Sequence, residues 1–162
     1  KKLCGKFRPG HFKGVVNVVN RFLGIIKPRS IYLGMKDFQQ LTLIKLHIIK
    51  NQIKTKVVSC PTIRENNGVA ISSRNIKLNK NQITKAGKIY NYLKCNKKKI
   101  IGKILNNQKS EIINKLIHLG ARKVDYLECV NLATLEISKN LKTNFNIFIA
   151  YYMDKVRLID NL

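Results

Sequence analysis

The residue types best suited to chemistry lie in one polar segment that directly follows an apolar stretch. The segment runs from residue 60 to residue 75 and reads Cys-Pro-Thr-Ile-Arg-Glu-Asn-Asn-Gly-Val-Ala-Ile-Ser-Ser-Arg-Asn. It brings together the hydroxyls of Ser72 and Ser73, the guanidinium of Arg74 and backbone amides. Hydroxyls and amides donate hydrogen bonds to phosphate oxygens, and an arginine can bind them with two parallel bonds. The segment is therefore typical of a triphosphate site.

A second segment combines a glycine with a cation where a helix is expected to begin. Gly34, Met35, Lys36 and Asp37 follow a short apolar stretch and precede a helical pattern. The first turn of a helix offers free amides and a positive dipole end, which attract phosphate, and Lys36 adds a full charge. The adjacent glutamines at 39 and 40 point to different sides of the helix, so one of them can face a ligand.

A third segment holds Arg8 and His11 around the pair Pro9-Gly10, which favours a turn. On residue type alone, His11 is more often a structural histidine with satisfied hydrogen bonds than a reacting group. Its role stays open at this level.

The hydrophobic pattern predicts how these segments are positioned. It indicates helices over 14–26 and 37–51 and strands over 30–33 and 54–59. A strand, a helix and a strand with short joins form a βαβ unit, whose strands are parallel. Ligands bind outside the carboxyl ends of such strands. We therefore expect Lys36 and Arg74 to converge on one pocket at that edge.

The remaining residues have a different pattern, which predicts a small α+β domain. A helix over 79–97 starts with an Asn79 cap and has a lysine-rich continuation over 97–104, and a second helix over 110–119 is capped by Ser110 and stopped by Gly120. Strands are expected over 124–130, 146–153 and 155–159, the last two joined by a tight turn at 153–155. Two helices followed by three antiparallel strands divide the chain into domains of residues 1–74 and 75–162.

Taken in this order and at these separations, the three segments resemble the pantothenate synthetase family, and the stretch Val-Arg-Leu-Ile-Asp-Asn at 156–161 resembles that family's ending. The resemblance implies an α/β fold: the C-terminal part of a Rossmann-like nucleotidyltransferase domain, of the class I synthetase kind, followed by the small α+β domain. Family members begin with a half that carries a His-Ile-Gly-His type motif. This sequence has no such motif and starts at Lys1, so we expect it to be the C-terminal portion of an enzyme.

The resemblance also implies an activity. Family members are ligases that condense pantoate with β-alanine, using ATP and Mg²⁺, through a pantoyl adenylate. They are cytoplasmic and usually homodimeric through the nucleotide-binding part. Because their essential histidines belong to the front half, we expect this chain by itself to bind nucleotide poorly and to turn over slowly or not at all.

Residue roles carry over by position. The implied ATP-binding residues are Gly34, Met35, Lys36, Asp37, Ile63, Ile71, Ser72, Ser73 and Arg74. Lys36 and Arg74 would stabilise charge in the transition state, Gln40 would hold pantoate, and Arg8 and His11 would have an orienting role. Most members carry glutamate where Met35 stands, and a thioether cannot replace its polar contact.

The net charge of +24 and the pI near 10.2 leave two alternatives open. A basic chain of this kind can be a nucleic-acid-binding module or a degenerate, non-catalytic fragment derived from the enzyme. The lysines are spread over every segment, and aromatics do not alternate with them in a stacking pattern. Abundant lysine, asparagine and isoleucine together are typical of AT-rich coding, so we favour compositional drift over nucleic-acid binding.

Other classes of site have little support in the sequence. The four cysteines form no Cys-x-x-Cys pair, which argues against zinc and favours buried, reduced thiols in a cytosolic protein. Asp125 and Glu128 fall on opposite faces of an expected strand and make no acid–base pair. No apolar run approaches the roughly 18 residues of a membrane helix, so we expect no membrane association through a spanning segment.

Overall fold

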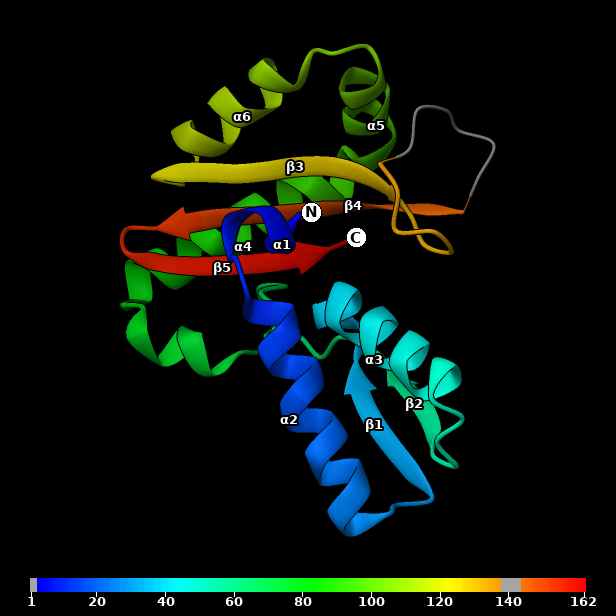
Figure 1. Cartoon of the computed structure of the whole chain (residues 1–162). Helices are drawn as coiled ribbons and strands as arrows, with labels where there is room; N and C mark the ends of the chain where they lie inside the picture. Colours follow the sequence, from blue (N-terminus) through cyan, green and yellow to red (C-terminus); the bar gives the residue numbers. More distant parts are fainter. Residues whose placement is uncertain (1–2, 138–143) are drawn as a thin grey trace. The chain divides into compact units, whose positions relative to one another are not determined.

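The computed structural model describes residues 3–137 and 144–162 and forms two compact units (Figure 1). The first unit ends at Thr62 and the second begins at Ile63. The segment from residue 63 to residue 74 thus groups with the residues that follow it. The domain boundary expected after residue 74 stays a prediction.

The first unit contains the predicted βαβ arrangement. Its described elements are α1 (Cys4–Phe7), α2 (His11–Ile26), β1 (Ser30–Gly34), the 3-10 helix η1 (Met35–Asp37), α3 (Phe38–Lys50) and β2 (Lys56–Cys60). β1 and β2 pair in parallel, with Ser30 opposite Lys56 and Gly34 opposite Cys60 (Figure 1). The parallel pair and its shared carboxyl edge, both predicted from the pattern, are confirmed.

Apolar side chains of α2 and α3 form the core of this unit. Leu23 from α2 and Ile44 and Ile48 from α3 are buried, and Ile31 and Val57 from the two strands pack against them. Successive strand residues point to opposite faces of a sheet. Tyr32, which follows Ile31 on β1, is 69% exposed.

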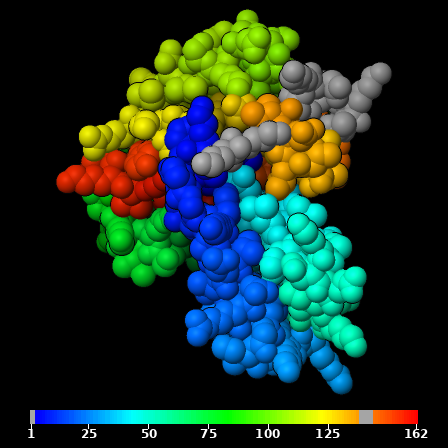
Figure 2. All heavy atoms as spheres, in the orientation of Figure 1, coloured from blue at the N-terminus to red at the C-terminus, as the bar shows by residue number. Residues whose placement is uncertain are grey.

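The sequence overestimated how much of α2 is buried. The spacing of its apolar residues predicts one wide apolar face, which includes Val18, Phe22 and Ile26, yet these three are exposed. Figure 2 shows atoms of α2, in blue, at the surface of the molecule. The helix also begins at His11 rather than at residue 14, because the turn that precedes it is completed at Gly10, whose φ is +78°.

The second unit contains helices followed by an antiparallel sheet. Its described elements are η2 (Ser73–Lys77), α4 (Lys80–Cys95), α5 (Lys97–Leu105), α6 (Lys109–His118), β3 (Lys123–Asn131), β4 (Phe145–Met153) and β5 (Val156–Asn161). The strand order is β3-β4-β5, and a tight turn joins Met153 to Val156. The predicted class, a small α+β unit with three antiparallel strands, is confirmed.

Three local predictions in this unit can be compared with the structure. Asn79 caps α4 as expected, in a reciprocal pair with Gln82: the Asn79 side chain accepts from the Gln82 amide, and the Gln82 side chain accepts from the Asn79 amide. The lysine-rich stretch is not a continuation of α4 but a separate helix, since the chain leaves helical geometry at Asn96. Ser110 was wrongly expected to cap α6, which already begins at Lys109.

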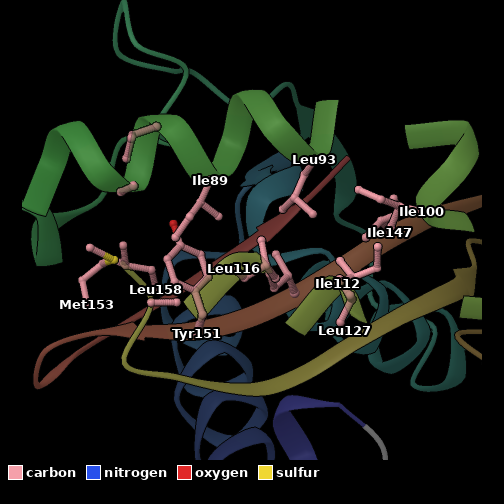
Figure 3. Packing of buried hydrophobic residues seen from close by; sticks show 14 of the residues in the cluster. Ile89, Leu93, Ile100, Ile112, Leu116, Leu127, Ile147, Tyr151, Met153 and Leu158 are labelled. Atoms are coloured by element: carbon pink, nitrogen blue, oxygen red, sulfur yellow. The ribbon is translucent and has the colours of Figure 1, made fainter. Parts of the chain in front are cut away.

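One large apolar cluster joins the three helices to one face of the sheet. Figure 3 shows Ile89 and Leu93 of α4 directed toward the side chains of the sheet, with Tyr151 and Leu158 among them. Ile89, Leu93 and Leu116 are at most 1% exposed. Burial of this apolar surface is the main term that stabilises the second unit.

The cysteines are free thiols in different surroundings, so the expectation that all four are buried is wrong. Cys4 and Cys129 are buried, Cys60 is half-buried and Cys95 is exposed. Burial, together with the nearby charge of Glu128, raises the pKa of Cys129 to about 11. Only the thiolate reacts with alkylating agents, so this thiol is poorly reactive near neutral pH.

We therefore expect iodoacetamide at pH 8 to label Cys95 at least about 100-fold faster than Cys129 in the folded chain. Mass spectrometry of timed digests measures the two rates. In denaturant the two cysteines should react at similar rates, which serves as the control. Equal labelling of both cysteines in the folded chain would contradict this packing.

Within residues 3–137 and 144–162, none of the helices has the length and apolar character needed to cross a bilayer. The same residues include no cluster of three or more His, Cys, Asp or Glu side chains placed to hold a metal ion.

Candidate functional site

The carboxyl edge of the β1–β2 pair positions the first group of predicted site residues. Gly34 ends β1 with extended backbone angles, and a Cβ added there would meet nothing within 4 Å. The chain then forms η1 from Met35 to Asp37 before α3 starts at Phe38. The predicted helix start is thus one 3-10 turn followed by an α-helix, and Lys36 lies in that turn.

The Lys36 side chain is largely shielded from solvent. It is only 16% exposed, and its Nζ lies 3.6 Å from a carboxylate oxygen of Asp37, whose side chain is 49% exposed. A cation with little exposure at a strand's carboxyl end and beside a helix start suits an anionic ligand. The adjacent carboxylate partly offsets its charge in the absence of such a ligand.

Gln40 lies in the first turn of α3, where it is half-buried. Its neighbour Gln39 faces a different part of the unit, since its amide nitrogen lies near Gly5. Adjacent helical residues are about 100° apart around the helix axis, so the two side-chain amides point in different directions. The role of Gln40 toward a ligand stays a prediction.

Arg8 and His11 contact each other across the turn at Pro9-Gly10. The Arg8 Nη1 atom donates to Nε2 of His11 at 2.7 Å. Because an arginine always carries its protons, Nε2 must be the acceptor, and the imidazole proton then resides on Nδ1. His11 therefore has a structural partner, and its orienting role toward a substrate stays a prediction.

The second group of predicted residues belongs to a short hairpin at the start of the second unit. The Ile71 amide donates to the Ile63 carbonyl at 3.0 Å, and the Glu65 amide donates to the Val69 carbonyl at 2.8 Å. The turn closes through Gly68, whose φ of +89° lies in the region that favours glycine. We call residues 63–71 the hairpin from here on.

Ile63 and Ile71 are exposed even though they are adjacent across the base of the hairpin. Their side chains are 72% and 51% exposed, respectively. Two exposed isoleucines at hydrogen-bonded positions give the second unit an apolar surface directly before the serine pair. Such a surface suits the flat face of a nucleobase, and the role of both residues in ATP binding stays a prediction.

The serine–arginine segment is ordered by its own hydrogen bonds. Ser72 Oγ accepts from the Arg74 amide at 3.3 Å and caps η2. Asn75 Nδ2 donates to the Ala70 carbonyl at 3.1 Å, which ties the segment back to the hairpin. Ser73, by contrast, is exposed. In this conformation, Ser72 acts as a cap and Ser73 is the more accessible hydroxyl.

Arg74 contacts strand β5 through its side chain, with Nη1 donating to the Arg157 carbonyl at 3.2 Å. A guanidinium has five N–H donors, so one bond to a neutral carbonyl leaves donor capacity for a phosphate. Lys36 and Arg74 belong to different units, so their expected convergence stays a prediction.

Sequence reasoning gave no role to the residues that hold the hairpin. Arg64 forms a two-pronged ion pair with Asp160, with Nη1–Oδ2 at 2.7 Å and Nη2–Oδ1 at 2.9 Å. The partners are separated by 96 residues, and nothing in one sequence indicates such a pairing. Burial alone would lower the pKa of Arg64, but the hydrogen bonds and charge of Asp160 outweigh it and raise that pKa.

The two carboxylates examined for acid–base chemistry are occupied by cations. Asp125 accepts from Arg157 Nε at 2.8 Å, and Glu128 accepts from Lys109 Nζ at 2.5 Å. Asp125 lies at a bulge in β3, between the paired residues Val124 and Tyr126. Both carboxylates are thus engaged by cations, which agrees with the view that Asp125 and Glu128 do not form an acid–base pair.

A cavity of about 320 Å³ lies beside the hairpin. Its lining residues are Glu65, Asn66, Asn67, Asn75 and Ile83. All of them except Ile83 belong to the polar segment of residues 60–75.

Comparison with known proteins places these features in a family. The family model described as pantoate-beta-alanine ligase matches residues 1–162. A pantothenate synthetase from Clostridium botulinum is 39% identical over 163 residues, covering 99% of this chain and 58% of its own length. One from Azobacteroides pseudotrichonymphae is 41% identical over 160 residues, covering 98% and 57%.

Solved structures agree with the sequence relatives. Pantothenate synthetase from Thermus thermophilus superposes with a TM-score of 0.84 at 31% identity, over 98% of this chain and 58% of that one. The Francisella tularensis ligase, complexed with beta-gamma ATP and beta-alanine, has a TM-score of 0.76 at 40% identity, over 99% and 53%. The chain therefore spans between half and three-fifths of the length of these relatives.

Proposed function

Because this chain belongs to the pantoate-beta-alanine ligase family, we propose that it supplies part of the site that condenses pantoate with β-alanine at the expense of ATP. The observation that carries the proposal is the family match over the whole chain. The parallel strand pair, with Gly34 and Lys36 at its carboxyl edge, supports it. By the same family argument, the complete enzyme would be a cytoplasmic homodimer.

The proposed reaction has two steps. A carboxylate oxygen of pantoate attacks the α-phosphorus of ATP, the bond to the bridging oxygen breaks, and pyrophosphate leaves. The amine of β-alanine then attacks the acyl carbon of the pantoyl adenylate, and AMP leaves as the amide forms and the amine loses a proton. The site must hold two anions together and stabilise charge at the phosphorus. Positioning of the substrates and electrostatic stabilisation meet these demands.

Each described group has a place in this scheme. Lys36 and Arg74 supply positive charge to the phosphates, and the hydroxyls of Ser72 and Ser73 donate to phosphate oxygens. Gln40 holds pantoate, because an amide both donates to a carboxylate and accepts from a hydroxyl. The exposed Ile63 and Ile71 make the apolar contact with adenine, while Gly34, Met35 and Asp37 line the nucleotide from the strand edge.

Magnesium would be bound mainly through the nucleotide. Within the described residues, no three His, Cys, Asp or Glu side chains form a metal site, and η1 offers the single carboxylate of Asp37. Mg²⁺ commonly takes one or two carboxylates and fills its other positions with phosphate oxygens and water. The donor set fits that mode, in which the ion would neutralise phosphate charge.

The proposal is tested with the chain itself and with a chimaera in which it replaces the matched region of the Clostridium botulinum enzyme. The chain with ATP, pantoate and β-alanine is expected to turn over slowly or not at all. The chimaera is expected to form pantothenate, AMP and pyrophosphate in equal amounts, and omission of pantoate should abolish all three. A chimaera that is folded yet inactive, or that yields ADP, would contradict the proposal.

The salt dependence of oligonucleotide binding distinguishes the alternative, a nucleic-acid-binding module, from the ligase. A basic module bound to DNA or RNA loses affinity steeply as salt rises, because binding releases counterions. Tight, strongly salt-dependent binding of a labelled oligonucleotide, unaffected by substitution of Lys36 or Arg74, would favour that alternative over the ligase.

A further inference from the structure

We propose that Arg64 is a positioning residue whose ion pair with Asp160 holds the hairpin in place and thereby presents Ser72, Ser73 and Arg74 to the nucleotide phosphates. This inference rests on the proposed function and assigns a role to a residue that the scheme above leaves unused.

The contacts of Arg64 fasten three parts of the second unit to one another. Besides the two bonds to Asp160, Nη1 donates to the Gly68 carbonyl at 3.0 Å and Nη2 donates to the Asn161 carbonyl at 3.3 Å. The guanidinium carbon lies 4.3 Å from the centre of the Tyr90 ring, which belongs to α4. One side chain thus joins the turn of the hairpin to β5 and to α4.

The geometry of this pair differs from that of a surface ion pair. The side chains of Arg64 and Asp160 are 20% and 11% exposed, and the two bonds are parallel. The pair between Arg122 and Asp154 in the same unit has a single contact at 3.5 Å and exposures of 64% and 58%. Shielded, two-pronged pairs impose a fixed geometry, whereas exposed pairs contribute little.

The turn of the hairpin packs closely against the Tyr90 ring. A Cβ at Gly68 would lie 2.0 Å from the Tyr90 ring, so the ring occupies the space that a side chain would need. Asn67 adds two bonds: its Oδ1 accepts from the Val69 amide at 3.1 Å, and its Nδ2 donates to the Ile83 carbonyl at 3.3 Å. The turn is therefore held from both sides.

A continuous set of bonds leads from Arg64 to the serine–arginine segment. The hairpin ends at Ile71, whose amide is bonded to Ile63, and Ser72 is the next residue. Arg74 also contacts β5, at Arg157, so the same strand holds both Arg64 and Arg74. Loss of the Arg64–Asp160 pair would make the backbone at Ser72, Ser73 and Arg74 more mobile. ATP binding would then have to order this backbone, and that entropy cost would lower the affinity for ATP.

The test uses Arg64→Lys, which keeps the charge but removes the two-pronged bond, and Asp160→Asn, which removes the charge with little change of shape. Arg122→Lys and Asp154→Asn are the matched controls. Hydrogen exchange is followed at the amides of Ile71 and Asn75 and, for comparison, in β4. ATP affinity, kcat and KM for each substrate are measured on the chimaera, as is the effect of ATP on hydrogen exchange.

We expect both Arg64 and Asp160 variants to raise amide exchange at Ile71 and Asn75 about tenfold while β4 is unaffected, and to raise the KM for ATP about tenfold with a smaller effect on the KM for β-alanine. Saturating ATP should restore protection of the two amides. The control variants should match the parent protein in all these measurements.

Two results would overturn the inference. Equal exchange increases in β4 and in the hairpin would show that Arg64 only stabilises the unit as a whole. An unchanged KM for ATP in the presence of a loosened hairpin would show that the hairpin does not position the phosphate groups. If the parent chain and chimaera bind no ATP at all, the proposed function fails and this inference fails with it, an outcome visible before any variant is made.

Discussion

Replacing Lys36 with alanine is expected to lower kcat of the chimaera about 100-fold, which corresponds to roughly 3 kcal/mol of lost transition-state stabilisation. Lys36 lies at the carboxyl edge of the parallel pair, and its side chain has limited exposure. A cation held in place before the reaction stabilises developing charge without the cost of reorganising solvent. Its loss cannot be compensated by the exposed lysines elsewhere on the chain.

The matched control for this change is Lys45→Ala. Lys45 is an exposed lysine of α3, so the substitution makes the same change in net charge on a nearby helix. Steady-state rates of AMP formation at saturating substrates measure kcat for both variants. Equal rates for the two would remove Lys36 from the site and leave the net charge of the chain as the explanation of any loss.

Replacing Leu116 with alanine is expected to lower the free energy of unfolding of the second unit by about 3 kcal/mol. Leu116 is 0% exposed and belongs to the cluster shared by the helices and the sheet (Figure 3). Removing three carbon atoms there deletes apolar contacts and leaves a cavity that close-packed neighbours fill only in part.

The adjacent residue is the control. Ile117 is 46% exposed, so Ile117→Ala removes a side chain of similar size and should cost less than about 1 kcal/mol. The chain has no tryptophan, so urea unfolding is followed by circular dichroism at 222 nm. Similar midpoints for the two variants would contradict the packing of α6 against the sheet.

Periodicity alone located most elements because the apolar residues of this chain follow the repeat of the structure they form. The parallel pairing of β1 and β2 and the presence of three antiparallel strands in the second unit were predicted from the pattern, whereas the order β3-β4-β5 comes from the structure. The Asn79 cap was also predictable, since the cap and its partner Gln82 are three residues apart.

Prediction failed where the hydrophobic pattern does not record the deciding feature. Lysine and isoleucine are both compatible with a helix, so the pattern continues past Asn96, where the chain leaves helical geometry and the Asn96 side chain donates to the Tyr92 carbonyl. The pattern of α2 indicates a wide apolar face because it records hydrophobicity and not the presence of a covering surface. The pair Arg64–Asp160 joins residues 96 apart, and only the fold reveals it.

The candidate site could be predicted from the sequence only where its residues are close along the chain. The segments around Lys36 and Arg74 stand out because each groups polar and charged residues within a few positions. That Ser72 is a cap, that Arg74 contacts a carbonyl of β5 and that Ile63 is exposed are properties of the folded chain. Residue types alone do not specify which hydrogen bonds a side chain makes or how exposed it is.

The two-strand sheet of the first unit has a consequence for the behaviour of the chain in solution. Among the described residues, β1 and β2 pair only with each other, so each has one side whose N–H and C=O groups lack a neighbouring strand. Parallel sheets are ordinarily covered on both faces, yet Tyr32 is largely open to water. The unpaired side of a strand is a template onto which another extended segment can add through backbone hydrogen bonds.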